Sequence, residues 1–420
     1  MRRLAIVGVL LLFGTPNAKL GLAADAGDRR FLVSVGSRAW AHWEFRYPVT
    51  YVFRLASIPA GAEVKRRDGS RGAWTVLPEK TVSDSFQGIS CVRFDQVKSL
   101  AFVSVGFGAN STTELEFRGA TGAKFERIAR YYDDRKAAYS LSIDNWGWRP
   151  TARPGAPWKG PTSDESDKYQ AALSVCRSFH VPVSVAINSR SAGHEAMWQA
   201  MQEELNRRDF SWEPAVHART HPGNAAAYRI QGCQAEILGC RDDLLAHLRN
   251  IPYGQHVFEH ILTSGYRDET ILSTDEEEFL FVRAFNGRDN PSSRDFTPWD
   301  AKRRFYGPGG MSTKDYDAVI ARREPKGRYF GRDVAELNEA FDRVYRGGRI
   351  CYALWHPDRY QNSVLYDPRP GIDGVQGSTL VQHLAYVAAH KDVWCVANGW
   401  LYCYRYVMEH GSVKEIAGRE

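Results

Sequence analysis

Two histidines four positions apart give this chain its clearest chemical signal. His217 and His221 follow an apolar run, and imidazole nitrogens are the commonest protein ligands of divalent transition metals. Asp144, Asn145 and His356 follow apolar runs elsewhere in the chain. Such a set could hold a metal ion, take a proton from water and protonate a leaving group, as a metal-assisted hydrolase does. Taken alone, a histidine pair at this spacing is more often a surface or core feature than a metal site.

The runs before these residues are predicted to be strands of an alternating α/β region. Strands are predicted at residues 138–143, 181–187, 210–217, 253–262, 278–285, 350–355 and 393–397, and helices at 168–180, 195–206, 236–248, 334–346, 379–390 and 400–407. This alternation indicates a parallel sheet or barrel. Because functional residues collect at the carboxyl ends of parallel strands, Asp144, His217 and His356 are expected to converge.

Three other stretches of this region suggest chemistry but favour structural roles. Residues 307–310 (Gly-Pro-Gly-Gly) lack the Lys and Ser/Thr of a phosphate-binding loop and indicate a turn. The acidic run at 275–278 indicates a solvated turn before a strand. His256 and His260 repeat the four-residue spacing, but Val257 stands where a zinc-protease helix requires Glu. Structural or surface roles are therefore favoured for both histidines.

The first third of the chain has a different pattern. Short β-rich runs separated by turn residues fill residues 29–120, which predicts a small β-sandwich-like domain. Residues 124–135 are expected to form a helical or extended connector. Residues 1–24 have the positive start, the short apolar stretch and the small-residue end of a signal peptide. We therefore expect a secreted or periplasmic protein with no other membrane-crossing segment.

Net charge and cysteine content indicate which kind of partner and which cellular compartment to expect. The formal net charge is +6, and the Lys and Arg residues are scattered along the chain, so a nucleic-acid partner is not expected. Export would place the seven cysteines in an oxidising compartment. Cys233 with Cys240, and Cys395 with Cys403, are the expected local pairs, and buried free thiols are the alternative. No Cys-x-x-Cys spacing supports a thiolate metal site.

In their order along the chain, the motifs resemble the polysaccharide deacetylases of carbohydrate esterase family four, over about residues 125–412. In that family a strand ends in Thr-Phe-Asp-Asp, whose first Asp is the catalytic base and whose second Asp binds the metal. Ser142-Ile143-Asp144-Asn145 occupies that place. The family's metal-binding motif His-Ser/Thr-x-x-His matches residues 217–221 in spacing but not in the hydroxyl after the first His. The family's general-acid histidine follows a late apolar strand, as His356 does.

The resemblance implies a fold and a mechanism. The fold would be α/β, a distorted (β/α)7-type barrel over residues 125–412 preceded by the small all-β domain. Asn145, His217 and His221 would hold a divalent metal, with zinc as the first expectation. Asp144 would be the catalytic base and His356 the general acid. The protein would remove acetyl groups from an acetylated polysaccharide or oligosaccharide.

The resemblance also implies sugar contacts near the base. Trp146 and Trp148 follow Asp144 closely and would form a wall for a sugar ring, because aromatic faces pack well on apolar sugar faces. Ordinary packing is an equal alternative for both side chains. The sequence leaves the oligomeric state open.

Two departures from the family pattern affect the expected chemistry. Asn145 stands where a ligating Asp is usual, and a neutral amide oxygen binds a metal more weakly than a carboxylate. A catalytically impaired, carbohydrate-binding relative is therefore the alternative function. The family's Arg-bearing motif is not evident, and Arg283 is a candidate to orient Asp144. The alternative for Arg283 is a solvated or salt-bridged strand residue.

Overall fold

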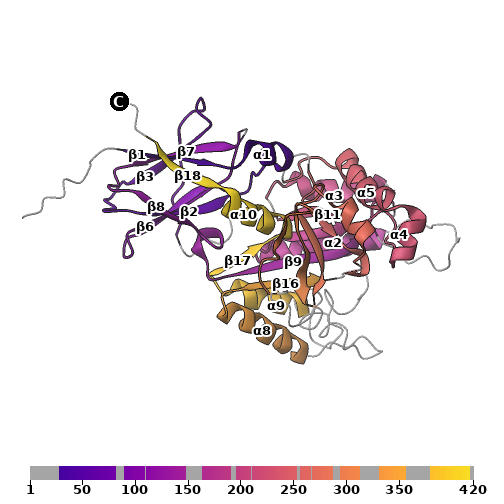
Figure 1. Cartoon of the computed structure of the whole chain (residues 1–420). Helices are drawn as coiled ribbons and strands as arrows, with labels where there is room; N and C mark the ends of the chain where they lie inside the picture. Colours follow the sequence, from indigo (N-terminus) through magenta and orange to yellow (C-terminus); the bar gives the residue numbers. More distant parts are fainter. Residues whose placement is uncertain are drawn as a thin grey trace, which may run out of the picture.

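The computed structural model describes residues 28–81, 89–108, 110–147, 163–190, 195–209, 211–252, 256–265, 267–286, 294–312, 331–355 and 379–416. Figure 1 shows a β-rich region beside a mixed region in which helices flank a sheet. One contiguous apolar core runs through both regions. Within the described ranges, no helix has the length and apolar character needed to cross a membrane. The predicted signal segment, 1–24, lies outside these ranges.

Two antiparallel sheets form the β-rich region, with strand orders β18-β1-β7-β3-β4 and β5-β6-β2-β8. Their strands are β1 (Arg29–Ser34), β2 (Val49–Arg54), β3 (Glu63–Asp68), β4 (Thr75–Val76), β5 (Cys91–Asp95), β6 (Leu100–Val105), β7 (Thr112–Arg118), β8 (Lys124–Ile128) and β18 (Ser412–Ile416). Phe31 on β1 and Phe117 on β7 both pack on Phe53 of the second sheet, each with ring centroids 4.8 Å apart. Inward-facing aromatic side chains thus fill the space between the sheets.

The β-runs expected within residues 29–120 correspond to β1, β2 and β4 to β7. Strand β3, helix α1 (Ser37–Trp43) and strand β18 were not predicted. The sequence of β3 is polar and only Val64 is buried, so its alternation is hidden. Strand β8 lies in the stretch expected to be a connector. Because β18 pairs with β1, the first sheet joins the two ends of the described chain.

The mixed region is built on one sheet with the order β14-β15-β13-β12-β11-β10-β9-β16, and β17 also pairs with β9. Its strands are β9 (Ala137–Trp146), β10 (Val183–Ile187), β11 (Trp212–Val216), β12 (Glu259–Ile261), β13 (Phe281–Asn286), β14 (Trp299–Asp300), β15 (Phe305–Ser312), β16 (Ile350–Trp355) and β17 (Val393–Val396). The pairings are parallel except that of β14 with β15. The fold is mixed α/β, and within the described ranges the strand path does not close into a barrel.

The helices of this region are α2 (Ser163–Ser178), α3 (Glu195–Asn206), α4 (Ala225–Gln231), α5 (Cys233–His247), α6 (Glu269–Thr274), α8 (Gly331–Arg346), α9 (Thr379–Ala388) and α10 (Asn398–His410). Each strand and helix predicted here is present, with some ends shifted. Strong periodicity explains this success: α3, for example, buries Met197, Met201 and Leu205 on the expected face.

Of the two turn predictions in this region, the one for residues 307–310 is wrong. Residues 307–310 lie inside β15, which pairs with β13. A Cβ atom on Gly307 would lie 2.4 Å from the Val282 carbonyl oxygen, so glycine is needed for this close strand pairing. Residues 276–278 do form a turn before β13 with Glu276 and Glu277 exposed, so the second prediction fails only at Asp275. Asp275 is fully buried, and its carboxylate lies 2.6 Å from His260 Nδ1. His260 is accordingly a structural residue that pairs with Asp275.

The expected disulfides are also absent, because the seven cysteines are free and buried. Cys233 and Cys240 both lie on α5. Seven residues of α-helix rise by about 10 Å, which is too far for a disulfide bridge. Cys395 lies on β17 and Cys403 on α10. The alternative of buried thiols is therefore the correct one for these residues.

Inward-facing side chains of the parallel strands form layers that lead up to the predicted site. The layer farthest from the site is polar. The next layer holds small and apolar residues and one arginine, and the residues at the strand ends lie above it. The polar layer holds Ser140, Ser184, Glu213 and Glu259, and the next layer holds Ser142, Ala186, Ala215, Ile261 and Arg283. Arg283, from β13, reaches Ser142 on β9 across this layer.

Candidate functional site

The carboxyl ends of β9 and β11 bring the predicted site residues together. Strand β10 lies between these two strands, and its Ile187 pairs with Trp146 on one side and with Val216 on the other. Asp144 and Asn145, near the end of strand β9, are 3% and 1% exposed, and His217, directly after β11, is 2% exposed. The convergence expected from parallel strand ends is thus observed for Asp144 and His217, whereas His356 lies outside the described residues.

His217 has a defined protonation pattern. Its Nδ1 lies 2.7 Å from the carbonyl oxygen of Ile261, and because a carbonyl only accepts, Nδ1 carries the hydrogen. Burial, together with the nearby His221, holds the pKa of His217 well below its usual value. The ring is therefore neutral, and Nε2 presents a lone pair, as a metal-ligating imidazole does.

That lone pair faces Asn145. Nε2 of His217 lies 3.1 Å from Oδ1 of Asn145, while Nδ2 of the amide is buried without a hydrogen-bond partner among the described residues. Two acceptors this close repel each other unless a cation lies between them or the amide turns over to donate. The arrangement therefore fits a cation that both atoms ligate.

His221 completes the candidate ligand set. Its ring centroid lies 4.8 Å from that of His217, with the ring planes at 74°. The intervening chain is unusual, since Ala218 and His221 have φ values of 63° and 58° in the left-handed region, where non-glycine residues are strained. Among the described residues, no group of three His, Cys, Asp or Glu side chains is placed to hold a metal. The candidate third partner is instead the amide oxygen of Asn145, 3.1 Å from His217 Nε2.

Buried polar groups hold the histidine loop in this strained shape. Asn188 donates from Nδ2 to the carbonyl oxygens of His217 and Ala218, at 2.5 and 3.1 Å. Glu236 on α5 accepts from the backbone N–H and the hydroxyl of Thr220, at 2.8 and 2.9 Å. Sequence reasoning missed both supports. The position of Asn188 directly after the predicted strand β10 was the available signal.

Arg283 orients Asp144. The guanidinium forms an ion pair with Oδ2 of Asp144 through Nη2 and donates to the Ser142 hydroxyl at 2.7 Å through Nη1. The arginine is 2% exposed. Oδ1 of Asp144 is buried with no hydrogen-bond partner among the described residues. The carboxylate is thus held by one oxygen, and the other can accept a proton. Arg283 is salt-bridged, as its alternative role allowed, and its partner is the predicted base.

Of the two predicted tryptophans and the late histidine, Trp146 alone lies among the described residues. Trp146 is fully buried and stacks on Tyr169 with ring centroids 5.1 Å apart and planes at 7°, which favours packing over sugar contact. Trp148 and His356 lie outside the described residues. Strand β16 ends at Trp355, which pairs with Ile143. The chain therefore leaves β16 beside Asp144.

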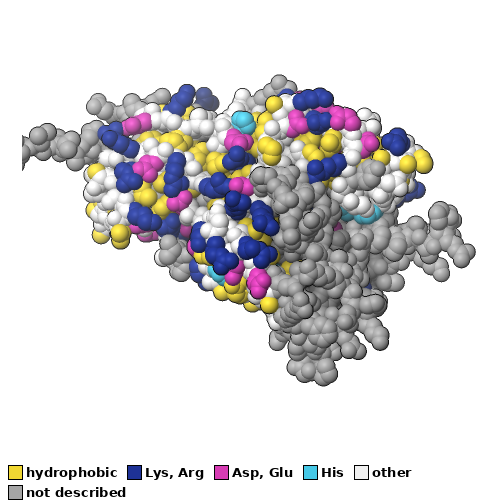
Figure 2. Space-filling model, turned by 60° about the horizontal axis from the view of Figure 1, so that its bottom comes forward, with side chains coloured by type: hydrophobic (Ala, Val, Ile, Leu, Met, Phe, Trp, Pro, Cys, Tyr) yellow, Lys and Arg dark blue, Asp and Glu magenta, His cyan; other side chains and the backbone are white. Residues whose placement is uncertain are grey.

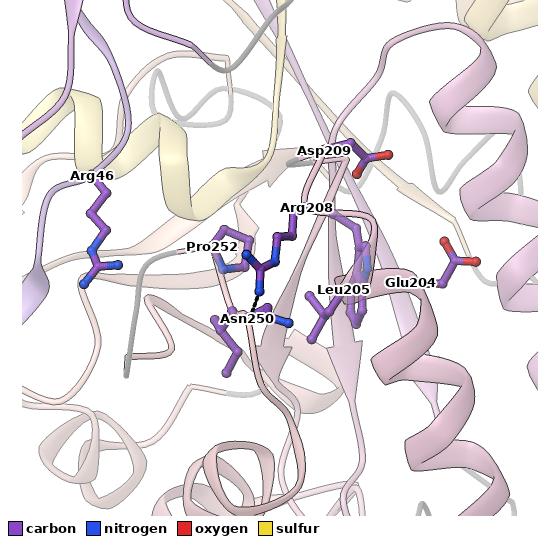
Figure 3. A pocket seen from close by; sticks show the side chains of 9 residues that line it. Arg46, Glu204, Leu205, Arg208, Asp209, Asn250 and Pro252 are labelled. Carbon is purple, nitrogen blue, oxygen red and sulfur yellow. Dashed lines mark hydrogen bonds between the residues drawn. The ribbon is translucent and has the colours of Figure 1, made fainter. Parts of the chain in front are cut away.

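The described cavities lie away from these strand ends. One, of about 230 Å³, is lined by Trp212 at the start of β11 and by the C-terminal end of α3. Figure 3 shows Arg208 donating to Asn250 across it, a bond of 3.1 Å. On the described part of the face in Figure 2, basic and acidic side chains are intermixed, so no single-sign patch dominates that part.

Comparisons with known proteins find similarity to solved structures. No family model matches the chain, and no curated protein matches it significantly. Among solved structures, it is similar to a protein assigned as a polysaccharide deacetylase from Mycobacterium smegmatis, with 14% identity, a TM-score of 0.44, and coverage of 68% of this chain and 94% of the other. It is also similar to a pseudoenzyme of carbohydrate esterase family four from Bacillus anthracis (12%, 0.36, 66% and 69%) and to a peptidoglycan deacetylase from Bacillus subtilis (11%, 0.33, 65% and 93%). Polysaccharide deacetylases, the expected resemblance, are thus among its structural neighbours.

Proposed function

We propose that this protein is an exported, metal-dependent deacetylase that removes acetyl groups from an acetylated polysaccharide. One observation carries the proposal. The buried carboxylate of Asp144 is held by Arg283 through one oxygen, and it neighbours a neutral imidazole whose unprotonated nitrogen faces an amide oxygen at 3.1 Å. A fixed base beside a candidate cation site is the minimal set for metal-assisted hydrolysis.

His217, His221 and Asn145 would hold the ion, which we propose to be zinc because two imidazoles and an oxygen suit it. When bound, a divalent metal supplies Lewis acidity toward the acetyl carbonyl and lowers the pKa of a coordinated water. Ile261 fixes the tautomer of His217 through the 2.7 Å contact with Nδ1. This contact aims the lone pair of Nε2 at the proposed ion.

Asp144 would take the proton of the attacking water on Oδ1, because Arg283 occupies Oδ2. We propose His356 as the acid that protonates the departing sugar nitrogen or oxygen, since β16 ends beside the strand that carries the base. Trp148 is the proposed sugar-contacting side chain. Trp146 would support the site through its stack on Tyr169.

The remaining parts of the proposal concern fold and location. The layered interior and the parallel strand order support a distorted (β/α)7-type barrel for the mixed region, with residues 29–120 forming a small β domain before it. Residues 1–24 would direct export, which places the protein in the periplasm or outside the cell. A polysaccharide or oligosaccharide is the proposed partner.

A catalytically impaired, carbohydrate-binding protein is the second candidate, and Asn145 favours it. The amide oxygen lies 3.1 Å from His217 Nε2 and brings no negative charge to offset the positive charge of a divalent ion. Weak metal binding would leave the carboxylate and histidines in place without turnover.

Acetate release from N-acetylated and O-acetylated oligosaccharides would decide between the two, measured on the full chain with zinc content recorded in parallel. We expect release that disappears in Asp144→Asn and His217→Ala. The matched control is Asp275→Asn, which neutralises a carboxyl as deeply buried but paired with His260 outside the site. Glycan binding without metal uptake or acetate release would support the impaired alternative and refute the enzyme.

A further inference from the structure

Glu259 lies in the polar layer beneath the site and has an unusual environment for a carboxyl group. It is fully buried and accepts a hydrogen bond of 2.8 Å from Nδ2 of Asn398. Its Oε2 has no hydrogen-bond partner among the described residues. Asn398 is itself fixed, because its Oδ1 accepts from Ser140 at 2.5 Å and its backbone N–H donates to Ser184 at 2.9 Å. The carboxyl group is therefore held in place by neutral partners.

The charged and titratable neighbours of Glu259 come from three elements. Glu213 on β11 and Tyr402 on α10 interact with it electrostatically, and neither supplies positive charge. Arg283 on β13 is the basic residue that faces it. Ile261, two residues after Glu259, pairs with Arg283 across the parallel ladder. Glu259 is therefore a diagonal neighbour of Arg283 on the same face, within reach of a long side chain.

Asp144 is ion-paired with the Arg283 guanidinium, and Glu259 interacts with the same group electrostatically. Arg283 reaches upward to Ser142 and Asp144, while the second buried carboxyl group lies in the layer below. The distribution of this charge depends on whether Glu259 is neutral or ionised, because a buried carboxylate attracts a nearby cation strongly in a low-dielectric interior.

We propose that Glu259 is a positioning residue: when neutral it leaves the Arg283 guanidinium to Asp144, and when ionised it draws that guanidinium away and releases the base from its working orientation. The inference rests on the proposed function for its effect on turnover. The interaction itself belongs to the fold and can be observed without turnover. Burial raises the pKa of Glu259 to about 8, with Arg283 opposing and Glu213 adding to the shift, so the change falls in an accessible pH range.

The test compares pH profiles of wild type and Glu259→Gln, which keeps the shape and hydrogen bond of the neutral form. Wild-type kcat should fall about tenfold between pH 7 and pH 9 as one group ionises near pH 8, whereas kcat of Glu259→Gln should stay within about twofold up to pH 9. The matched control is Asp275→Asn, which neutralises a buried carboxyl paired with His260, and its profile should follow that of wild type. Superimposable profiles for wild type and Glu259→Gln would overturn the proposal.

A second measurement does not depend on turnover. In protein labelled with ¹³C at the Asp side-chain carboxyl, the Asp144 signal is assigned from its loss in Asp144→Asn. This signal should shift near pH 8 in wild type and in Asp275→Asn, but not in Glu259→Gln. An Asp144 signal with the same pH response in wild type and Glu259→Gln refutes the positioning role. A wild type with no acetate release but with the Glu259-dependent shift refutes the deacetylase and leaves the positioning role standing.

Discussion

Two buried carboxyl groups, one in each region of the molecule, have opposite environments. In the β-rich region, Glu116 is fully buried but accepts hydrogen bonds of 2.7 Å from both Arg30 and Arg118. In the mixed region, Glu259 is as buried and accepts from the neutral amide of Asn398. Burial raises both pKa values, but the two guanidinium groups outweigh it at Glu116, whose pKa is lowered, while that of Glu259 is raised to about 8.

The difference shows where the fold keeps buried polar groups that lack a charged or hydrogen-bonding partner. A buried charge is expensive unless it is paired and hydrogen-bonded, and Glu116 meets that condition. In the interior of the mixed region, Asp144, Asn188 and Glu259 each keep a buried side-chain oxygen without a partner among the described residues. Such groups are retained where chemistry requires them.

Removing Arg283 should produce the largest effect. Arg283→Met keeps much of the length but leaves the buried carboxylate of Asp144 without its counter-ion, which should destabilise the fold by about 3–5 kcal/mol and abolish acetate release. Urea unfolding measures the first effect. The double variant Arg283→Met/Asp144→Asn should recover most of the stability without activity. Equal stability of Arg283→Met and wild type would contradict the importance of the pair.

Neutralising Glu259 should change how stability depends on pH. Because the folded-state pKa of about 8 lies above the ordinary value of 4.5, the protonated folded state is favoured. Its contribution is complete below about pH 4.5 and is lost as pH rises through 8, by on the order of 3–5 kcal/mol. Glu259→Gln lacks this loss, so unfolding measured at pH 5 and pH 9 should show a gain for the variant that is confined to pH 9. An equal difference at both pH values would argue against a protonated Glu259.

Restoring charge at the candidate ligand should have an intermediate effect. Asn145→Asp replaces the amide oxygen that faces His217 Nε2 with a carboxylate, so the affinity for zinc should rise about tenfold or more because ligand charge strengthens cation binding. Titration with a competing chelator measures this affinity. Ser142→Ala, which removes a hydroxyl from the same strand without touching the ligand set, is the matched control. Unchanged zinc affinity in Asn145→Asp would place the ion elsewhere or nowhere.

The sequence predicted the elements of the mixed region because burial imposes clear periods on them. Strand β9 is buried throughout, and α3 shows a regular apolar face. The meeting of Asp144 and His217 could be predicted because parallel strands end at one edge. Strand β3 was missed because its polar residues hide the alternation, and β15 because its glycines suggest a turn when pairing partners are unknown.

The supports of the site were harder to predict. Arg283 lies far from Asp144 in sequence, and its ion pair joins β13 and β9, two strands that are not neighbours in the sheet. Neither sequence period nor motif contains that information. Glu259 carries no motif either, and only the packing of α10 beneath the strands brings Asn398 to it.

The smallest effect is expected at Glu116, because two guanidinium groups compensate its charge. Arg30→Gln removes one of the two guanidinium groups on Glu116, and Arg118 still donates to the carboxylate at 2.7 Å. Since Arg118 is half exposed, the loss in unfolding free energy should be about 1 kcal/mol or less at neutral pH, with acetate release unchanged. Because the pKa of Glu116 is lowered, its stabilising contribution is present above the unfolded-state pKa and lost as pH falls, so the variant and wild type should converge in acid. This response is opposite in direction to that of Glu259→Gln. A loss from Arg30→Gln as large as that from Arg283→Met would mean that the two regions do not differ in how they tolerate a buried carboxylate.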